Sequence, residues 1–428
     1  MDKAFRRCSW VAATNIYEVN LRQYTSEGTI RAFMSHLPRL QDMGVETLWL
    51  MPVTPISQKN RKGSLGSYYA ASDYMSVNPE FGNMDDFCAL VQDAHARGMK
   101  IIIDWVANHT GWDHVWTQQH PEFYTRDEQG NFKPPFPDWE DVIHLNYQEP
   151  ILWKAMIAAM RFWVDQCGID GFRCDMAMLV TRDFWTEARK QLDAVKPLFW
   201  YGEFDQWDNP DYAYIFDASY SWRWMHASAE FYRHHRNIAA LDGTLQHYDH
   251  MGPQEHIRSF FTSNHDENSW NGTEYEKYVE MAKPLAVFSC TWNGIPLIYS
   301  GQELPNYQRL PFFDKGAISW TDECKLHLFY KTLLQLRKTN ASLQAGDPSV
   351  HTIRLGNNAD HEVFAFVRKH AMGELLVVLN FSPYPHHIHL FDDRVQGDFT
   401  NVFTQQILDL NVERHISLEA WGFRVYSK

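Results

Sequence analysis

Residues 100–109 read KIIIDWVANH, and this stretch decides which fold the chain adopts. Its three consecutive isoleucines make both faces apolar, which is typical of a strand buried in a parallel sheet. A helical pattern precedes it over 83–98, with Asn83 as a cap and Gly98 as a stop. A buried strand that directly follows a helix predicts a sheet covered by helices.

The same alternation of strand and helix extends outward from this stretch through the first three quarters of the chain. Strands are expected at residues 14–21, 45–52, 100–109, 169–175, 198–204, 215–220, 256–268 and 294–303. Helices are expected at 29–44, 83–98, 149–168, 181–195, 222–238, 275–291 and 323–338. Eight such strand–helix units over about 340 residues predict an α/β fold, the (β/α)8 TIM barrel with insertions.

Two segments depart from this alternation and divide the chain into expected domains. Residues 110–146, between the third strand and the next helix, lack clear periodicity, so we expect a short inserted domain there. From residue 343 onward, short β-rich runs with turn residues between them predict a C-terminal antiparallel β-sandwich over 343–428. The catalytic barrel would then comprise residues 1–109 and 147–342.

Composition excludes some classes of partner. The net charge of −14 argues against binding to nucleic acid or to an anionic membrane surface, because both need basic patches. No apolar run reaches the roughly 18 residues of a membrane-spanning helix. The first residues, MDKAFRRCSWVAATN, lack the apolar core of a signal peptide. We therefore expect a cytoplasmic location, or a secreted or periplasmic one if a signal peptide has been removed.

The cysteines give no sign of a disulfide framework or a zinc site. They are scattered, with no short CxxC spacing, at positions 8, 88, 167, 174, 290 and 324. Residues of this kind are often packed as small hydrophobic groups, so we expect free thiols.

Acidic residues end four of the predicted strands, namely Asp104, Asp175, Glu203 and Asp266. Because the chemistry of such barrels takes place at the carboxyl ends of the strands, we expect several of these carboxylates to converge on one opening. Any one of them alone could be a helix cap. Several carboxylates together, with histidines and an arginine beside them, are the side chains that glycoside hydrolysis requires.

The strand GFRCDMA (171–177) contains a pair of charged residues in an apolar stretch. Side chains alternate along a strand, so Arg173 and Asp175 share one face and Cys174 lies on the other. Burying a charge is costly unless the charge is paired or used in function. We therefore expect the pair to face the opening of the barrel.

These segments resemble the α-amylase family of glycosidases, glycoside hydrolase family thirteen. The chain contains four segments that resemble the family's four signatures and follow the same order. They are DWVANH (104–109), GFRCDMA (171–177), YGEF (201–204) and FTSNHD (261–266). GSYYAASDY (66–74) and GIPLIYSGQE (294–303) also resemble family segments. The resemblance covers nearly the whole chain, including the insertion and the C-terminal β domain.

The resemblance implies roles for the carboxylates. Asp175 matches the nucleophile, which forms a covalent glycosyl intermediate, and Glu203 matches the acid/base. Asp266 matches the third carboxylate, which binds ring hydroxyls and helps to distort the sugar. Arg173 would hydrogen-bond the nucleophile and keep it ionised and oriented. Asp104 matches a structural residue of the first signature.

The resemblance also implies substrate-binding residues. His109 and His265 match histidines that bind hydroxyls of the sugar being cleaved. Tyr69 matches the aromatic residue that stacks under that sugar ring, although Tyr68 competes for this role because the register there rests on SDY (72–74) alone.

Three departures from the family pattern affect specificity. Ala70 stands where exo-acting α-glucosidases carry aspartate, which favours a cleft open to longer chains. Met178 and Leu179 stand where many α-amylases carry Lys-His, so the contacts with the leaving sugar differ. His144 stands where an aspartate is common, so the ligands of a metal site are unknown. Asn108 could still bind a structural calcium ion.

The expected function is a retaining α-glycosidase acting on α-1,4-glucans such as starch, glycogen or maltooligosaccharides, with no cofactor required for the chemistry. One alternative is transglycosylation by the same site, in a 4-α-glucanotransferase or a maltose-forming enzyme. Another is a non-catalytic carbohydrate-binding homologue, because fold does not fix function. A metal-dependent hydrolase using His109 and His265 would need a further cluster of ligands.

Overall fold

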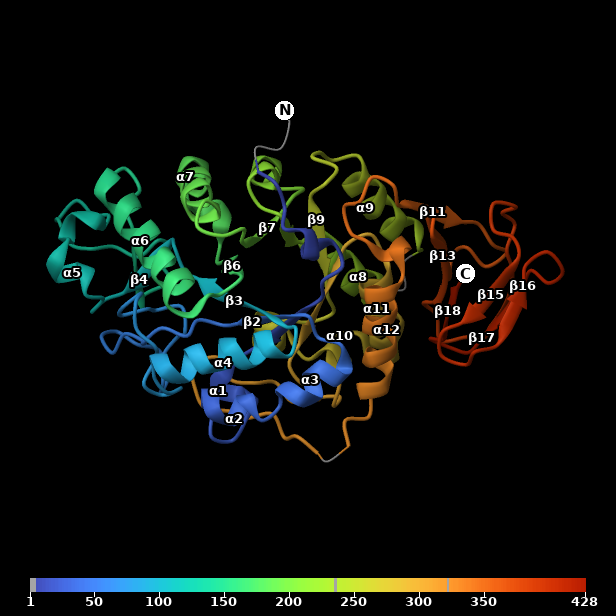
Figure 1. Cartoon of the computed structure of the whole chain (residues 1–428), viewed down its shortest axis with the longest axis horizontal. Helices are drawn as coiled ribbons and strands as arrows, with labels where there is room; N and C mark the ends of the chain where they lie inside the picture. The colour runs from blue at the N-terminus through green and yellow to red at the C-terminus, as the bar shows by residue number, and fades with distance from the viewer. Residues whose placement is uncertain (1–4, 235–236, 322) are drawn as a thin grey trace.

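The computed structural model describes residues 5–234, 237–321 and 323–428, and within them eight parallel strands close into a barrel (Figure 1). Each strand pairs with the next around the barrel, and the last pairs with the first. In this order they are β1 (Ile16–Val19), β2 (Thr47–Leu50), β3 (Lys100–Trp105), β6 (Gly171–Cys174), β7 (Phe199–Asp205), β8 (Ala218–Tyr220), β9 (Ile257–Phe260) and β10 (Ile295–Tyr299). The predicted barrel is confirmed.

Helices surround the barrel (Figure 1). They are α1 (Leu21–Tyr24), α2 (Ile30–Met34), α3 (Leu37–Met43), α4 (Met84–Ala96), α6 (Pro150–Cys167), α7 (Arg182–Asp193), α8 (Trp222–His234), α9 (Ala239–Asp249), α10 (Glu274–Tyr278), α11 (Ala282–Thr291) and α12 (His327–Thr339). Short 3-10 helices are η1 (Ser9–Ala12), η3 (Ala177–Leu179), η4 (Pro210–Tyr214), η6 (Val279–Met281) and η7 (Ala341–Leu343), and η5 (Glu267–Asn271) is a π-helix.

The single helix predicted over 29–44 is wrong, because the segment forms two helices, α2 and α3. Pro38 lies at the start of α3, where a missing backbone N–H is tolerated, whereas inside one long helix it would remove a hydrogen bond. The second of the two ends at Gly44, whose φ of 94° is the left-handed conformation of a helix cap.

The segment 110–146 extends to one side of the barrel, at the left of Figure 1. It contains the hairpin of β4 (His109–Gly111) and β5 (Val142–His144), with α5 (Trp116–Gln119) and η2 (Pro121–Phe123) between them. In the fully described stretch 343–428, six strands form an antiparallel sheet and two more form a separate pair. These strands are β11 (His351–Leu355), β12 (Val363–His370), β13 (Gly373–Asn380), β14 (His386–His389), β15 (Asp398–Asn401), β16 (Ile407–Asp409), β17 (His415–Leu418) and β18 (Phe423–Ser427). The domain boundaries given above remain our proposal.

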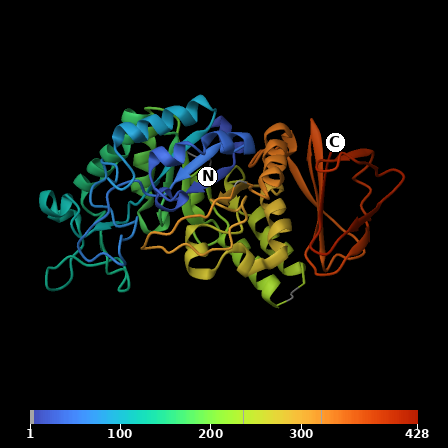
Figure 2. The ribbon, with the colours of Figure 1, turned by 90° about the horizontal axis from the view of Figure 1, so that it is seen from below.

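The C-terminal sheet lies at one end of the molecule, beside α11 and α12 (Figures 1 and 2). Aromatic side chains pack across this contact, with Trp292, after α11, lying 4.8 Å from Phe366 of β12, between ring centroids. Arg368 of β12 is fully buried and donates hydrogen bonds to the carbonyl oxygens of Trp292 and Gln344 at 2.6 and 3.1 Å. One face of the sheet therefore belongs to the same buried cluster as the barrel, while its other face contributes to a separate cluster.

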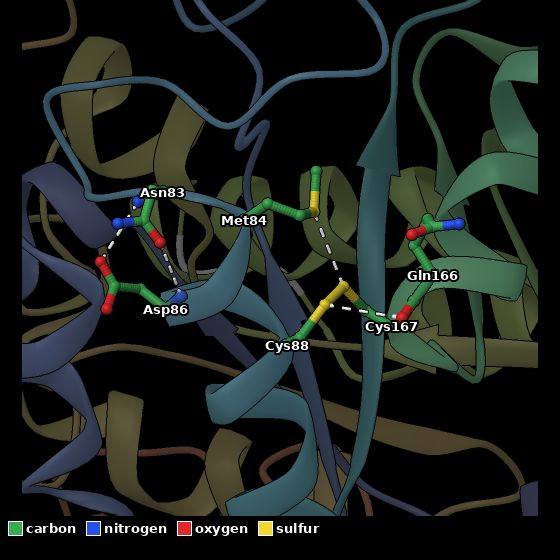
Figure 3. Close-up of a disulfide and its surroundings, with 6 residues drawn as sticks. All are labelled: Asn83, Met84, Asp86, Cys88, Gln166 and Cys167. Carbon is green, nitrogen blue, oxygen red and sulfur yellow. Dashed lines mark hydrogen bonds between the residues drawn. A yellow bond between two sulfur atoms is a disulfide. The ribbon is translucent and has the colours of Figure 1, made fainter.

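Two cysteines are bonded to each other, so the expectation that all were free thiols was wrong. Cys88 of α4 and Cys167 of α6 form a disulfide across 79 residues of sequence, with their Cα atoms 4.7 Å apart (Figure 3). The two helices pack side by side outside the barrel, and this proximity leaves no signal in the spacing of the cysteines. The remaining thiols, of Cys8, Cys174, Cys290 and Cys324, are free.

Among the described residues, none of the helices has both the length and the apolar character needed to cross a membrane.

Candidate active site

Arg173 lies at the centre of the carboxylates that the sequence predicted. It projects from β6, is fully buried, and its Nη1 donates to both oxygens of Asp104 at 2.9 and 3.1 Å and to Asp175 Oδ1 at 3.0 Å. Its Nη2 lies 2.8 Å from Glu203 Oε2. One guanidinium thus contacts carboxylates from three strands.

The strand register explains this gathering. In the parallel pairs β3–β6 and β6–β7, Arg173 stands opposite Asp104 on one side and Tyr201 on the other. Asp175 and Glu203 each lie two residues further along their strand, on the same face, at the carboxyl ends. The predicted alternation of Arg173 and Asp175 about Cys174 is therefore present.

The residue after the expected nucleophile has an unusual backbone. Met176 has a φ of 39°, in the left-handed region that side chains other than glycine seldom adopt. Its amide N–H donates to Glu203 Oε2 at 2.9 Å. The turn thus orients the expected acid/base toward Asp175.

Burial controls the charge of these carboxyl groups. It raises the pKa of Asp175 well above its usual range, and the neighbouring Glu203 adds to the effect while Arg173 opposes it. Burial also raises the pKa of Asp104 to about 6 against the influence of Arg173. Arg173 donates to Asp175 as expected, and its positive charge favours the ionised form of that carboxyl group against the effect of burial.

His265 links the cluster to the first strand. Its Nδ1 lies 2.5 Å from Glu18 Oε1, and its Nε2 lies 2.8 Å from the hydroxyl of Tyr69 and 3.3 Å from Asp266 Oδ2. Although burial favours the neutral ring, Asp266 and Glu18 raise the pKa of His265 to about 9. The imidazolium at neutral pH therefore donates from both ring nitrogens.

The structure decides between the two tyrosines. The hydroxyl of Tyr69 donates to Asp104 Oδ2 at 3.1 Å, and the Tyr69 ring lies 5.6 Å from that of His265. Tyr68 instead packs under the guanidinium of Arg22, away from these carboxylates. Of the two, Tyr69 is therefore the tyrosine that contacts the predicted carboxylates.

Asp266 and His109 lie at the edges of the cluster. Asp266 follows β9 by six residues and immediately precedes η5, and more than a third of its side chain is exposed, at 37%. His109 is buried where β4 begins, and the backbone of Tyr69 hydrogen-bonds it. Burial and the neighbouring His144 lower the pKa of His109 to about 3, so the ring is neutral.

Aromatic side chains extend the site outward from Tyr69. The ring of Phe312 lies 6.1 Å from that of Tyr69 and is inclined to it by 19°. Trp270, which is 54% exposed, lies 5.4 Å from Phe312 between ring centroids. This aromatic wall of Tyr69, Phe312 and Trp270 runs from the carboxylates to solvent.

Sequence reasoning missed Glu18, Phe312 and Trp270. Glu18 lies within the buried strand β1, and an acidic residue flanked by Tyr17 and Val19 was the signal that could have identified it. Phe312 and Trp270 lie outside the signatures, Phe312 in a loop and Trp270 in the short π-helix η5, and no periodicity predicts the course of either segment.

The neighbourhood of Asn108 does not fit a calcium ion. Calcium takes about six to eight oxygen ligands, chiefly from carboxylates and carbonyls. Here His144 supplies an imidazole on β5, and the Asn108 amide nitrogen lies 3.2 Å from His109 Nδ1. Throughout the described residues, no group of three or more His, Cys, Asp or Glu side chains is placed to hold a metal ion.

Comparisons with known proteins agree with this geometry. The family model for the α-amylase catalytic domain matches residues 12–144 and 136–322. An α-amylase structure from Lactobacillus plantarum is 26% identical, with a TM-score of 0.87 over 98% of this chain and 100% of that one. A maltogenic α-amylase from Thermotoga neapolitana is 29% identical, with a TM-score of 0.88 over 98% and 99%.

Two relatives found by sequence comparison are longer than this chain. A cyclomaltodextrinase from Thermoanaerobacter pseudethanolicus is 25% identical over 83% of this chain but only 64% of its own length. An α-amylase from Haloarcula japonica is 26% identical over 88% of this chain and 56% of its own length. The family model nevertheless spans most of the barrel, so the chain belongs to the α-amylase family of glycoside hydrolases.

Proposed function

We propose that the chain is a retaining α-glycosidase that hydrolyses α-1,4-glucosidic bonds in starch, glycogen or maltooligosaccharides. The observation that carries this proposal is that Asp175 and Glu203 lie 3.0 and 2.8 Å from the two terminal nitrogens of Arg173. Carboxyl groups held so close fit the roughly 5–5.5 Å separation of retaining enzymes better than the roughly 6.5–9.5 Å of inverting ones. Family membership and the names of the relatives support a glucan substrate.

The chemistry requires two displacements at the same carbon. In the first, Asp175 attacks the anomeric carbon while protonated Glu203 gives its proton to the glycosidic oxygen, and the leaving sugar departs. In the second, ionised Glu203 takes a proton from water, whose oxygen attacks that carbon and releases Asp175. Arg173, which donates to Asp175 Oδ1, favours the ionised form of the attacking carboxylate against the effect of burial.

The remaining residues would hold the sugar. Asp266, partly exposed at the rim, would accept hydrogen bonds from ring hydroxyls, and the His265 imidazolium would donate to one. Neutral His109 can both donate and accept. The ring of Tyr69 would contact the sugar that is cleaved. These contacts accelerate the reaction to the extent that they strengthen in the transition state.

The test is Glu203→Gln, assayed for hydrolysis of maltoheptaose. We expect activity to fall by roughly 10²–10⁴-fold, because the general acid is lost, while thermal unfolding stays near that of the wild type. Glu128→Gln, an exposed change of the same chemistry, should retain full activity. Wild-type turnover in Glu203→Gln would overturn the proposal, and inactivity of the wild type would favour a carbohydrate-binding role.

A second candidate is transfer of the glycosyl group to another sugar. The observation that favours it is the apolar pair Met178 and Leu179, partly buried just after the nucleophile strand, which would disfavour water on the leaving side. The same maltoheptaose reaction separates the two candidates. Products longer than the substrate would indicate transfer, whereas shorter products alone would indicate hydrolysis.

A further inference from the structure

A large groove lies between the barrel and the C-terminal sheet. It has a volume of about 1270 Å³ and is bounded by α10, α11 and α12 on one side and by β15 and β18 on the other. Small-molecule sites measure roughly 300–1,000 Å³, so this groove could hold a longer ligand. None of the residues proposed above for catalysis or sugar binding lines it.

Aromatic rings line both walls. On the barrel side, Tyr307 is 68% exposed and its ring lies 4.5 Å from that of Tyr275. On the side of the sheet the lining rings are Phe403, Trp421, Phe423 and Tyr426. These rings, apart from the buried Tyr426, are left partly open to solvent although several pack on one another, and such exposed apolar surfaces stack on sugar rings.

Strained backbone concentrates at this groove. Of the five non-glycine residues with positive φ in the described chain, Val279 (48°) and Trp421 (54°) line it. Gln405 (62°) lies between the lining residues Thr404 and Gln406. A β-branched residue in this conformation is costly, and residues strained in this way gather at binding sites. The remaining examples include Met176, in the proposed catalytic site.

The charges in the groove favour a neutral ligand. Its lining includes four carboxylates and three cations, which are Glu274, Glu276, Glu280, Glu419, Lys283, Lys325 and Arg424. Arg424 and Glu419 pair with each other at 3.0 Å, and the ammonium of Lys283 lies 5.3 Å from the ring centroid of Phe329. A polyanion such as nucleic acid would need a surplus of cations that this lining lacks.

The groove also adjoins the catalytic opening. Asn268, in the same π-helix as Trp270, donates from its side chain to the carbonyl of Gln308, beside Tyr307, at 3.3 Å. It accepts from the amide of Leu310, two residues before Phe312, at 2.8 Å. One segment thus carries both Tyr307, which lines the groove, and Phe312 of the aromatic wall, so groove and site share a rim.

We infer that this groove binds a second stretch of an α-glucan chain while another stretch occupies the carboxylate site. The inference rests on the proposed function for the identity of the ligand. Size, open aromatic faces, balanced charge and a shared rim all fit a neutral polysaccharide. A second site of this kind would retain the enzyme on a large glucan without affecting the cleavage of short ones.

The test uses the full chain carrying Glu203→Gln, so that glycogen is bound but not degraded. Affinity electrophoresis in gels containing glycogen gives the dissociation constant. Adding Tyr307→Ala should weaken binding by roughly five- to tenfold, whereas Tyr307→Phe, which keeps the ring, should restore most of it. Tyr384→Ala is the matched control, because that tyrosine is 63% exposed on the C-terminal domain outside the groove.

The catalytically active chain separates this inference from the proposed function. Tyr307→Ala should leave kcat/KM for maltoheptaose unchanged while lowering activity on glycogen. Unchanged glycogen binding in Tyr307→Ala, or an equal loss in Tyr384→Ala, would overturn the inference. Failure of the wild type to cleave maltoheptaose would instead overturn the proposed function.

Discussion

At the scale of single residues, the site packs five carboxyl groups around two cations. The carboxyl groups belong to Glu18, Asp104, Asp175, Glu203 and Asp266, and the cations are Arg173 and His265. With more acids than bases in a buried volume, charge repulsion and desolvation both favour protonated carboxyls. Arg173 opposes both effects at Asp104 and at Asp175.

Glu18 sets the charge of His265, which leads to our first prediction. In Glu18→Gln the pKa of His265, raised to about 9 in the wild type, should fall because one of its two carboxylate partners is neutral. The alkaline limb of the kcat/KM profile for maltoheptaose should then move to lower pH. Titration of His265 by NMR measures the same change directly, and an unmoved alkaline limb would contradict this role.

The same ion pair predicts how stability depends on pH. The pKa of His265 in the folded chain is raised to about 9, above the ~6.5 of an unfolded histidine. Its stabilisation is therefore complete below about pH 6.5 and is lost as pH rises through about 9. Denaturant unfolding of the wild type should show this loss, and Glu18→Gln should show a smaller one.

Residues at strand ends could be predicted from the sequence, whereas those inside strands and loops could not. Asp175 and Glu203 end buried strands, where an acid has few structural uses, and both contact Arg173. Glu18 lies mid-strand, and only the closure of the barrel between β1 and β10 brings that strand near His265. Ionisation was also beyond prediction, because it depends on burial and on neighbours from other strands.

At the scale of elements, the strands were predictable and the segments between them were not. A strand apolar on both faces has few alternatives to a parallel sheet, so seven of the eight barrel strands lie within their predicted ranges, and β7 exceeds its range by one residue, Asp205. Helix ends depended on local details, such as Pro38 between α2 and α3. The loop that carries Phe312 has no regular pattern, so its approach to Tyr69 is set by tertiary packing.

The aromatic wall predicts a preference for longer substrates. Trp270→Ala removes the most exposed ring of this wall. Among the described residues, that ring contacts Phe312 but none of the carboxylates of the cluster. We expect KM for maltoheptaose to rise about three- to tenfold with kcat nearly unchanged, because only a remote sugar loses its contact. Steady-state kinetics on maltotriose provide the control. A fall in kcat with both substrates would instead assign Trp270 to the catalytic centre.

The disulfide between α4 and α6 should stabilise the barrel. Cys88→Ser opens a covalent loop of 79 residues, and disulfides typically contribute about 2–4 kcal/mol, more for long loops. We expect the melting temperature to fall, and reductant should lower the wild type to the level of the variant. Cys324→Ser, at a free thiol, should leave both values unchanged. An absent reductant effect would show that the bond contributes nothing.

At the scale of the whole molecule, one face of the C-terminal sheet is part of the barrel's core. The same cluster of buried residues contains Phe288 of α11 and Phe364 and Phe366 of β12. A change from alternating strand–helix units to short strands predicted a separate sheet, but no pattern within either part predicts which faces will meet. This contact also forms the walls of the groove, so the groove too could not be predicted from the sequence.

Arg368 provides the test of this shared core. Its guanidinium is fully buried and bonds two carbonyl oxygens, those of Trp292 and Gln344, outside the sheet. Arg368→Ala leaves both carbonyls unpaired and a cavity, so we expect a loss of about 3 kcal/mol or more in the free energy of unfolding. Arg394→Ala, at an exposed arginine paired with Asp392, should change it little.

Calorimetry shows whether the two parts unfold together. Because the core is continuous, the wild type should give one transition, with calorimetric and van 't Hoff enthalpies in agreement. Arg368→Ala should lower the temperature of that single transition by several degrees. If the wild type instead gave two transitions, and Arg368→Ala moved only the lower one, the sheet would be an independent unit. The groove between them would then lack the rigid walls that a binding site needs.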